Sequence, residues 1–214
     1  MLTRPKTSLR KSLVIAIAGL AILALPGCVA QGSYDPPDDW FADRDTVMPV
    51  NNKIYVCHTY GCRRRTIVQF NDQDLGELRA ILEVGAASPI TERAAVSKAV
   101  QWYELRIARD VGNHNDKGGY DASMSGVPGQ MDCIDEATNT TSLLMVAQAN
   151  QMLAHHKVRK PVAKGFFLDG RYPHATAVLV ENSGKGTYAI DSYPRGNAEP
   201  PVIMDLDAWY ASRT

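Results

Sequence analysis

The order of its predicted elements is the feature that most constrains how this 214-residue chain folds. Apolar residues at helical spacing predict one helix over about residues 72–84 and a second over about residues 88–110. A polar, glycine-rich stretch over residues 112–130 follows, and we expect it to form a solvated loop. A third helix is predicted to begin near Cys133 and to run to about Leu153.

Strand patterns dominate the chain after these helices. Val, Ile and Leu are enriched between glycine-containing breaks, which predicts strands over residues 161–168, 175–181 and 187–191. His155 and His156 are expected at the end of the third helix, where positive charge suits the helix dipole. The C-terminal segment is expected to pack Leu206 and Trp209 back on the domain. Helices followed by an antiparallel sheet predict an α+β domain.

The N-terminus has the composition of an export signal. Its first 27 residues hold four positive charges, no acid and the apolar run 13–25, which is too short for a transmembrane helix. The exit Leu25-Pro26-Gly27-Cys28 resembles a bacterial lipobox, in which the cysteine is lipidated and becomes the new N-terminus. We therefore expect a lipoprotein signal peptide over residues 1–27 and a lipid anchor at Cys28. The alternative is an ordinary signal peptide that is cut nearby and leaves Cys28 free.

Charge excludes one class of partner. The 23 basic and 23 acidic residues cancel, which argues against nucleic-acid binding by bulk charge. Four of the basic residues lie in the leader, so the exported part is mildly acidic. Residues 28–52, with five aspartates and three prolines, predict an acidic linker that the pair Trp40-Phe41 would dock onto a domain over residues 53–214. In enterobacterial lipoproteins an Asp after the lipidated cysteine favours the inner membrane, so Val29 favours the outer membrane, facing the periplasm.

Two cysteines flank the turn of a predicted β-hairpin over residues 53–70. Cys57 and Cys62 are placed to form a disulfide across this turn, and the oxidising periplasm would preserve it. Two free thiols are the alternative. A metal site would need more ligands, and only His58 lies near.

The segment MDCIDEATNTT places a cysteine at the start of the third helix. Asp132 is a good N-cap and Asp135 occupies the third helical position, where its carboxylate can reach back to the cap. This register puts Cys133 in the first position, where the helix dipole favours a thiolate. Asp132, Asp135 and Glu136 oppose that ionisation, so a cationic partner is needed.

His174 is the candidate partner, because it opens the apolar run 175–180 and so begins a strand. Asp191 ends the next predicted strand. In two antiparallel strands joined by a short hairpin, the start of one lies beside the end of the other. We therefore expect His174 and Asp191 to be neighbours, with Asp191 holding one imidazole nitrogen and directing the other at Cys133.

A cysteine at a helix N-terminus followed by His and Asp on successive strands resembles the transglutaminase-like cysteine hydrolases of the papain-like superfamily. The segment from Gly129 to Ala137 resembles the Gly-Asp-Cys-acid-acid pattern of the bacterial transglutaminase-like cysteine proteinases, with Gln130-Met131 inserted before Asp132. The phrases GQMDCIDEATNTT, PHATAVLV and YAIDSYPRGN also resemble uncharacterised proteobacterial proteins. The resemblance covers about residues 90–195 and implies a transglutaminase-like fold, with the cysteine-bearing helix packed on an antiparallel sheet.

The resemblance also implies roles for these residues. Cys133 would be the nucleophile, His174 the general base and acid, and Asp191 the orienting carboxylate. The backbone N–H of Cys133 and Gln130 would stabilise the oxyanion. A thioester would lead to hydrolysis, deamidation or cross-linking. The sequence leaves the substrate open between an envelope protein, a peptide and a peptidoglycan amide. No cofactor is required. Some relatives bind calcium through acids beside the cysteine, for which Asp132, Asp135 and Glu136 are weak candidates.

Simpler interpretations exist for each of these residues. Cys133 could be an inert core cysteine, His174 a hydrogen-bonded residue at a strand end, and Asp191 a turn former. Three functional hypotheses therefore stand: a thiol hydrolase or acyltransferase, a catalytically inactive binding lipoprotein on the same fold, and a structural envelope protein. The structural hypothesis predicts that His174 and Asp191 lie too far apart to touch.

Overall fold

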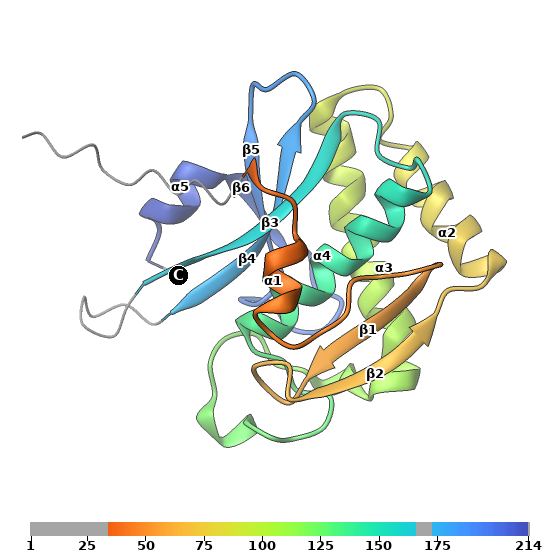
Figure 1. Ribbon diagram of the computed structural model, residues 1–214. Coiled ribbons are helices and arrows are strands. Elements are labelled where there is room, and N and C mark those ends of the chain that lie inside the picture. The colour runs from red at the N-terminus through yellow and green to blue at the C-terminus, as the bar shows by residue number, and fades with distance from the viewer. Residues whose placement is uncertain (1–33, 166–172, 214) are drawn as a thin grey trace, which may run out of the picture.

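A computed structural model describes residues 34–165 and 173–213 of the chain. Its elements run in the order α1 (Asp38–Ala42), β1 (Lys53–His58), β2 (Arg64–Gln69), α2 (Asp72–Glu83), α3 (Pro89–Val111), η2 (Asn113–Asn115), η3 (Ala122–Met124), α4 (Cys133–Ala149), β3 (His156–Lys164), β4 (His174–Glu181), β5 (Thr187–Asp191), β6 (Val202–Asp205) and α5 (Leu206–Ala211). Helices and two antiparallel sheets make this an α+β fold, as predicted (Figure 1).

Helix α4 lies at the centre of the described part of the molecule. It contacts β3 and β4 of the four-stranded sheet and β1 of the two-stranded hairpin, and it runs between these two sheets in Figure 1. Its side chains are buried along nearly its whole length, including a polar run from Thr138 to Ser142. Asn139 shows why polar residues suit this helix, because its amide accepts from the N–H of Cys57 and donates to the C=O of Cys57. This pair of bonds fixes β1 against α4.

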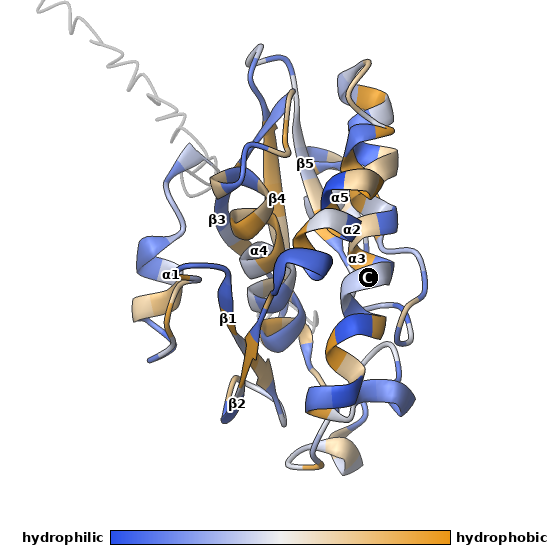
Figure 2. Cartoon of the chain, turned by 90° about the vertical axis from the view of Figure 1, so that its right-hand side faces the viewer, coloured by the Kyte–Doolittle hydropathy of each residue, from blue (hydrophilic) through white to orange (hydrophobic). Residues whose placement is uncertain are grey.

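The four-stranded sheet has the order β3-β4-β5-β6, with every neighbouring pair antiparallel. Strand β4 is central and buried from His174 to Val180, and its apolar residues colour it orange in Figure 2. A continuous apolar run is what a strand covered on both faces requires. Together with α2, α3 and α4, the sheet encloses the main core, which includes Leu78, Val100, Leu144 and Leu179.

The starts of α2 and α3 follow local capping rules. Asn71 caps α2 and Ser88 caps α3, each in a reciprocal capping box with the residue three positions later. Pro89 occupies the first turn of α3, and Gly112 ends α3 in the left-handed conformation at φ 81°. The two predicted helices are therefore confirmed.

The predicted end of the third helix was wrong. Helix α4 stops at Ala149, because Asn150 caps it and Gln151 adopts a positive φ of 57°. His156 does not end the helix but begins β3, where its Nδ1 lies 2.8 Å from Glu92 Oε1 on α3. Strand β3 accommodates Pro161 at a register shift between Arg159 and Val162, where a missing N–H costs no ladder bond. The predicted end of this strand at residues 166–168 lies outside the described residues.

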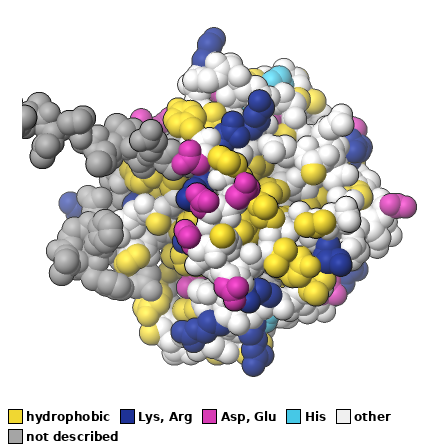
Figure 3. Space-filling model, viewed as in Figure 1, with side chains coloured by type: hydrophobic (Ala, Val, Ile, Leu, Met, Phe, Trp, Pro, Cys, Tyr) yellow, Lys and Arg dark blue, Asp and Glu magenta, His cyan; other side chains and the backbone are white. Residues whose placement is uncertain are grey.

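The acidic segment before the hairpin packs on the domain through α1. Trp40 and Phe41 are buried, with 3% and 2% of their surfaces exposed, whereas Asp38, Asp39 and Asp43 are exposed. Figure 3 shows acidic side chains gathered over α1 in the middle of this face. The aromatic pair therefore docks this segment, as the sequence predicted. Among the described residues, no helix combines the length and the hydrophobicity that crossing a bilayer requires.

Candidate functional site

Cys133 occupies the first position of α4, in the predicted register. The side chain of Asp132 accepts hydrogen bonds from the N–H groups of Ile134 and Asp135, both at 3.0 Å. Asp135 returns the bond by accepting from the N–H of Asp132. The cap takes these two N–H groups and not that of Cys133, which leaves the helix dipole directed at the cysteine.

His174 and Asp191 meet where β4 begins and β5 ends. The last paired residues of these strands are Ala177 and Ile190, so continuing the register by one pair puts Thr176 opposite Asp191. His174 lies two residues before Thr176 and therefore shares its face of the sheet. The result is a distance of 2.6 Å between His174 Nε2 and Asp191 Oδ2, with both residues buried. The predicted contact is confirmed, and the expectation of the structural hypothesis that these residues lie too far apart to touch is wrong.

The second ring nitrogen of His174 is poised differently. Nδ1 is buried and has no hydrogen-bond partner among the described residues. A neutral imidazole that donates its Nε2 proton to Asp191 carries an unshared electron pair on Nδ1. Nδ1 of such an imidazole can therefore accept a proton.

The sulfur of Cys133 lies against the backbone on both sides of His174. Cys133 Sγ is 3.7 Å from the carbonyl oxygen of Pro173, to which it donates, and the N–H of Ala175 donates towards the sulfur. Cys133 also packs with Ala137 and Ala175. The thiol thus reaches the backbone on either side of His174, whereas the imidazole itself lies against Asp191 and Trp209, and no hydrogen bond among the described residues joins it to the sulfur.

Burial sets the protonation state of the cysteine. Cys133 is 6% exposed, and desolvation, followed by the charge of Asp132, raises its pKa to about 12. The N–H of Ala175 lowers the pKa but does not offset burial. At pH 7 only about one Cys133 in 10⁵ would be a thiolate without help. A reaction at this sulfur therefore needs a base that removes the proton during attack.

Helix α1 covers the candidate nucleophile. Trp40 and Phe41 form one apolar cluster with Cys133, and the indole N–H of Trp40 donates to Thr138 Oγ1 on α4 at 2.9 Å. The guanidinium of Arg44 stacks on the Trp40 ring at 3.2 Å from its centroid. Burial lowers the pKa of Arg44, while the charges of Asp43, Cys133 and Asp132 act in the opposite direction. Arg44 is therefore a cation within electrostatic reach of the sulfur.

Gln130, the predicted oxyanion donor, has other partners in this structure. Its side-chain NH₂ donates to the backbone carbonyl of Asn115 at 3.0 Å, and the backbone carbonyl of Gln130 accepts from the N–H of Thr59. The polar loop that contains it was predicted to be solvated, but Gln130 and Asp116 are buried. Asp116 is buried because its carboxylate accepts from the N–H of Met131, which anchors the loop just before α4.

The acids beside Cys133 all accept hydrogen bonds from other parts of the protein. Asp132 accepts from Gly61, Asp135 accepts from Tyr60 and Cys62, and Glu136 accepts from the hydroxyl of Ser192. The four residues from Thr59 to Cys62 all have a positive φ, and this left-handed turn points its N–H groups at the start of α4. The weak calcium candidates therefore tie the start of α4 to this turn and to Ser192.

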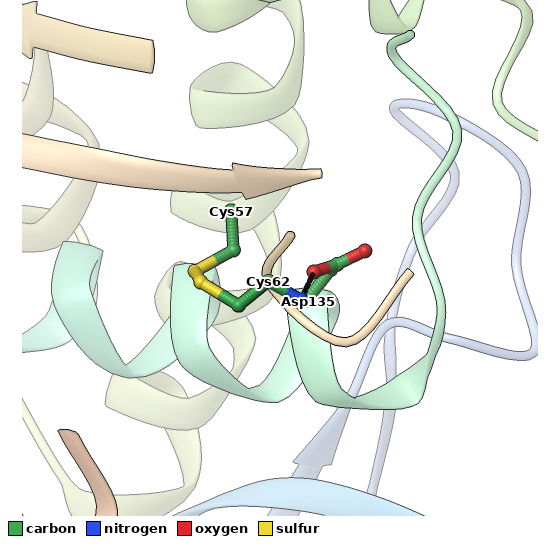
Figure 4. Close-up of side chains that lie close together, drawn as sticks. All are labelled: Cys57, Cys62 and Asp135. Carbon is green, nitrogen blue, oxygen red and sulfur yellow. Dashed lines mark hydrogen bonds between the residues drawn. A yellow bond between two sulfur atoms is a disulfide. The ribbon is translucent and has the colours of Figure 1, made fainter. Parts of the chain in front are cut away.

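The predicted disulfide between Cys57 and Cys62 is present and closes this turn (Figure 4). Cys57, Cys62 and Asp135 form the one cluster of metal-ligand types found among the described residues. Their sulfurs are bonded to each other, and Asp135 accepts from the N–H of Cys62. The cluster is thus a disulfide docked on a helix cap.

Several carboxyl groups are buried behind the start of α4. Burial raises the pKa of Glu104 to about 9, that of Glu136 to about 8 and that of Asp116 to about 7, and the neighbouring acids add to each shift. These groups are expected to carry protons at neutral pH or below. The acidity that the sequence places near Cys133 is therefore only partly ionised in the fold.

Comparisons with protein-family models, with curated proteins and with solved structures find no match to this chain.

Two contacts at the site escaped sequence reasoning. Trp209 Nε1 donates to Asp191 Oδ2 at 2.8 Å, and Trp40 covers Cys133. The sequence indicated that both tryptophans pack on the domain, but no local pattern shows which polar group an indole N–H will reach.

Proposed function

We propose that the chain is an envelope-anchored thiol hydrolase or acyltransferase that acts on amide or peptide bonds through Cys133, His174 and Asp191. The observation that carries this proposal is the state of His174. Asp191 holds Nε2, while Nδ1 is buried without a partner among the described residues, and the neighbouring backbone contacts the Cys133 thiol. An imidazole held in this way has the tautomer that a general base needs.

The chemistry follows from these protonation states. His174 Nδ1 takes the proton of Cys133 as the sulfur attacks the carbonyl carbon, so a C–S bond forms and the electrons move onto the carbonyl oxygen. The N–H of Cys133, at the start of α4, stabilises that oxyanion. When the intermediate collapses, the C–N bond breaks and His174 returns the proton to the leaving amine. Water then hydrolyses the thioester, or an amine takes the acyl group.

The order of the three site residues along the chain, and the elements that carry them, support a relationship to the transglutaminase-like cysteine hydrolases. Cysteine at a helix start, histidine on the following sheet and aspartate on the next strand is the arrangement that the sequence resembles. The envelope location rests on the signal-like leader and on Cys28, which lie outside the described residues. The disulfide between Cys57 and Cys62 adds support, because disulfides persist in oxidising compartments.

One observation favours a second candidate, a binding lipoprotein without turnover. The thiol is buried under Trp40 and Phe41, and its pKa is raised to about 12. A protein that only binds would tolerate such a thiol, whereas an enzyme must uncover it when substrate arrives.

Acylation by an activated ester distinguishes the two candidates. The purified exported domain is incubated with p-nitrophenyl acetate, and intact-mass and peptide-mass spectrometry locate the acetyl group. The proposal predicts a thioester on Cys133 that forms in the wild type and in His114→Ala, a control at an exposed position in the short helix η2. It predicts no acylation in Cys133→Ser at this position and strongly slowed acylation in His174→Ala. Equal acylation of Cys133 in wild type and His174→Ala would favour the binding protein.

A further inference from the structure

The carboxylate of Asp191 has two donors on a single oxygen. Oδ2 accepts from Trp209 Nε1 at 2.8 Å and lies 2.6 Å from His174 Nε2. The other oxygen, Oδ1, is buried and has no partner in the part of the chain that the structure describes. Almost all of the hydrogen bonding that holds this carboxylate therefore comes from one imidazole and one indole.

Trp209 is itself rigidly held. It lies on α5, which Asp205 caps by accepting from the N–H groups of Asp207 and Ala208. Its side chain is fully buried at 0% exposure. Lys164 Nζ lies 4.3 Å from the centroid of its ring and donates to its carbonyl oxygen. Because the indole of Trp209 cannot move freely, its N–H holds the Asp191 carboxylate in one position.

The ring of Trp209 also contacts His174 directly. The two ring centroids are 5.4 Å apart, with an angle of 41° between the planes. Tyr193 contacts the same imidazole, with 5.0 Å between the centroids. Trp209 thus touches both the histidine and the carboxylate that orients it.

We infer that Trp209 is a positioning residue for the reaction, one that locks the Asp191 carboxylate and reduces its pull on the His174 proton. The inference rests on the proposed function for its role in catalysis. A carboxylate oxygen that already accepts a hydrogen bond from one donor attracts the proton of the other donor less strongly. Without the indole N–H, Asp191 Oδ2 would bind the Nε2 proton of His174 more tightly, and the carboxylate would be free to rotate.

The substitution Trp209→Phe removes the N–H and keeps an aromatic ring. We expect the acidic limb of the pH profile for Cys133 acylation to move to higher pH by about half a unit or more. A purely structural loss would lower the rate without moving this limb. The matched control is Trp102→Phe, since Trp102 Nε1 also donates to a carboxylate, Glu77 Oε2 at 2.9 Å, on the exposed surface of α2 and α3.

A second variant guards against misfolding of Trp209→Phe. Replacing the indole of Trp209 with benzothiophene keeps the shape of the side chain and exchanges the N–H for sulfur. The acidic limb of the pH profile for Cys133 acylation should move by a similar amount. If the acidic limb of the pH profile stays at its wild-type position in both variants, the inference is overturned.

A spectroscopic measurement separates this inference from the proposed function. In ¹⁵N-labelled protein, the Nε2–H resonance of His174 reports its hydrogen bond to Asp191 whether or not Cys133 reacts. The inference predicts that this resonance moves in Trp209→Phe and stays in place in Trp102→Phe. If the wild type fails to acylate but the resonance moves, the proposed function fails and the positioning role of Trp209 stands. If the resonance is unchanged, the positioning role fails.

Discussion

His174 Nε2 lies 2.6 Å from Asp191 Oδ2, across the start of β4 and the end of β5. This contact leaves Nδ1 of the imidazole as the nitrogen that can accept a proton. Because the pKa of Cys133 is raised to about 12, the site cannot rely on a thiolate that exists before substrate binds. A base must instead remove the proton during attack, and this is the role that we propose for His174.

Asp191→Asn should therefore lower the acylation rate of Cys133 by about 10²-fold or more. The amide NH₂ of asparagine would donate to Nε2, and the imidazole proton would move to Nδ1, where it blocks the base. Stopped-flow acylation with p-nitrophenyl acetate measures the rate, and Asp207→Asn, exposed on α5, serves as the control. A variant as fast as wild type would show that Asp191 does not orient His174.

Trp40→Ala should speed the alkylation of Cys133 by at least about threefold, because α1 covers the sulfur and the site must open locally for a reagent to enter. Iodoacetamide labelling followed by peptide mapping gives the rate. The matched control Trp102→Ala removes a tryptophan from α3, far from Cys133 in the sequence. Unchanged labelling in Trp40→Ala would mean that α1 does not limit access.

The free energy of unfolding should fall as the pH rises from about 5 to about 9. Glu104 and Glu136 have folded-state pKa values raised to about 9 and about 8, so they keep protons that the unfolded chain has already released above about pH 4.5. Folding then binds protons, and stability is lost as the pH rises through the folded-state values. Urea unfolding at a series of pH values measures this slope.

Glu104→Gln provides the internal check on that pH dependence. Its amide oxygen can still accept from the N–H of Ala198, the partner of Glu104, but it cannot ionise. The variant should unfold with a shallower pH dependence than the wild type. An equally steep decline would assign the effect to other groups.

Cys57→Ser combined with Cys62→Ser should lower the free energy of unfolding by about 2 kcal/mol, the entropy expected for a loop this short. The turn would lose its covalent closure, and its left-handed residues would no longer hold their N–H groups against Asp135. Urea unfolding of both proteins, with and without reductant, measures the difference. Reductant should destabilise only the wild type, and a loss of stability in both would point to another cause.

Local patterns account for what the sequence could predict. The cap at Asp132 fixes Cys133 at the helix start within four residues, and an antiparallel hairpin brings His174 to Asp191 through strand alternation alone. The disulfide followed from two cysteines around one turn.

Contacts between distant elements account for what the sequence could not predict. Trp40 meets Thr138 across 98 residues, a contact with no periodic signal. The burial of Asp116 and Glu104 depends on backbone N–H groups supplied by other loops, and composition alone made the loop around Asp116 look solvated. Helix α4 ends at Ala149, just before a positive φ at Gln151, a residue type that gives no stop signal.

The rate at which Cys133 reacts with iodoacetamide at pH 7, in wild type and in His174→Ala, tests the central claim most directly. A buried thiol with a pKa of about 12 reacts very slowly by itself, so measurable labelling requires a base. The account predicts that Cys133 is labelled in the wild type and that labelling falls at least about tenfold in His174→Ala. Equal rates in the two folded proteins would contradict it.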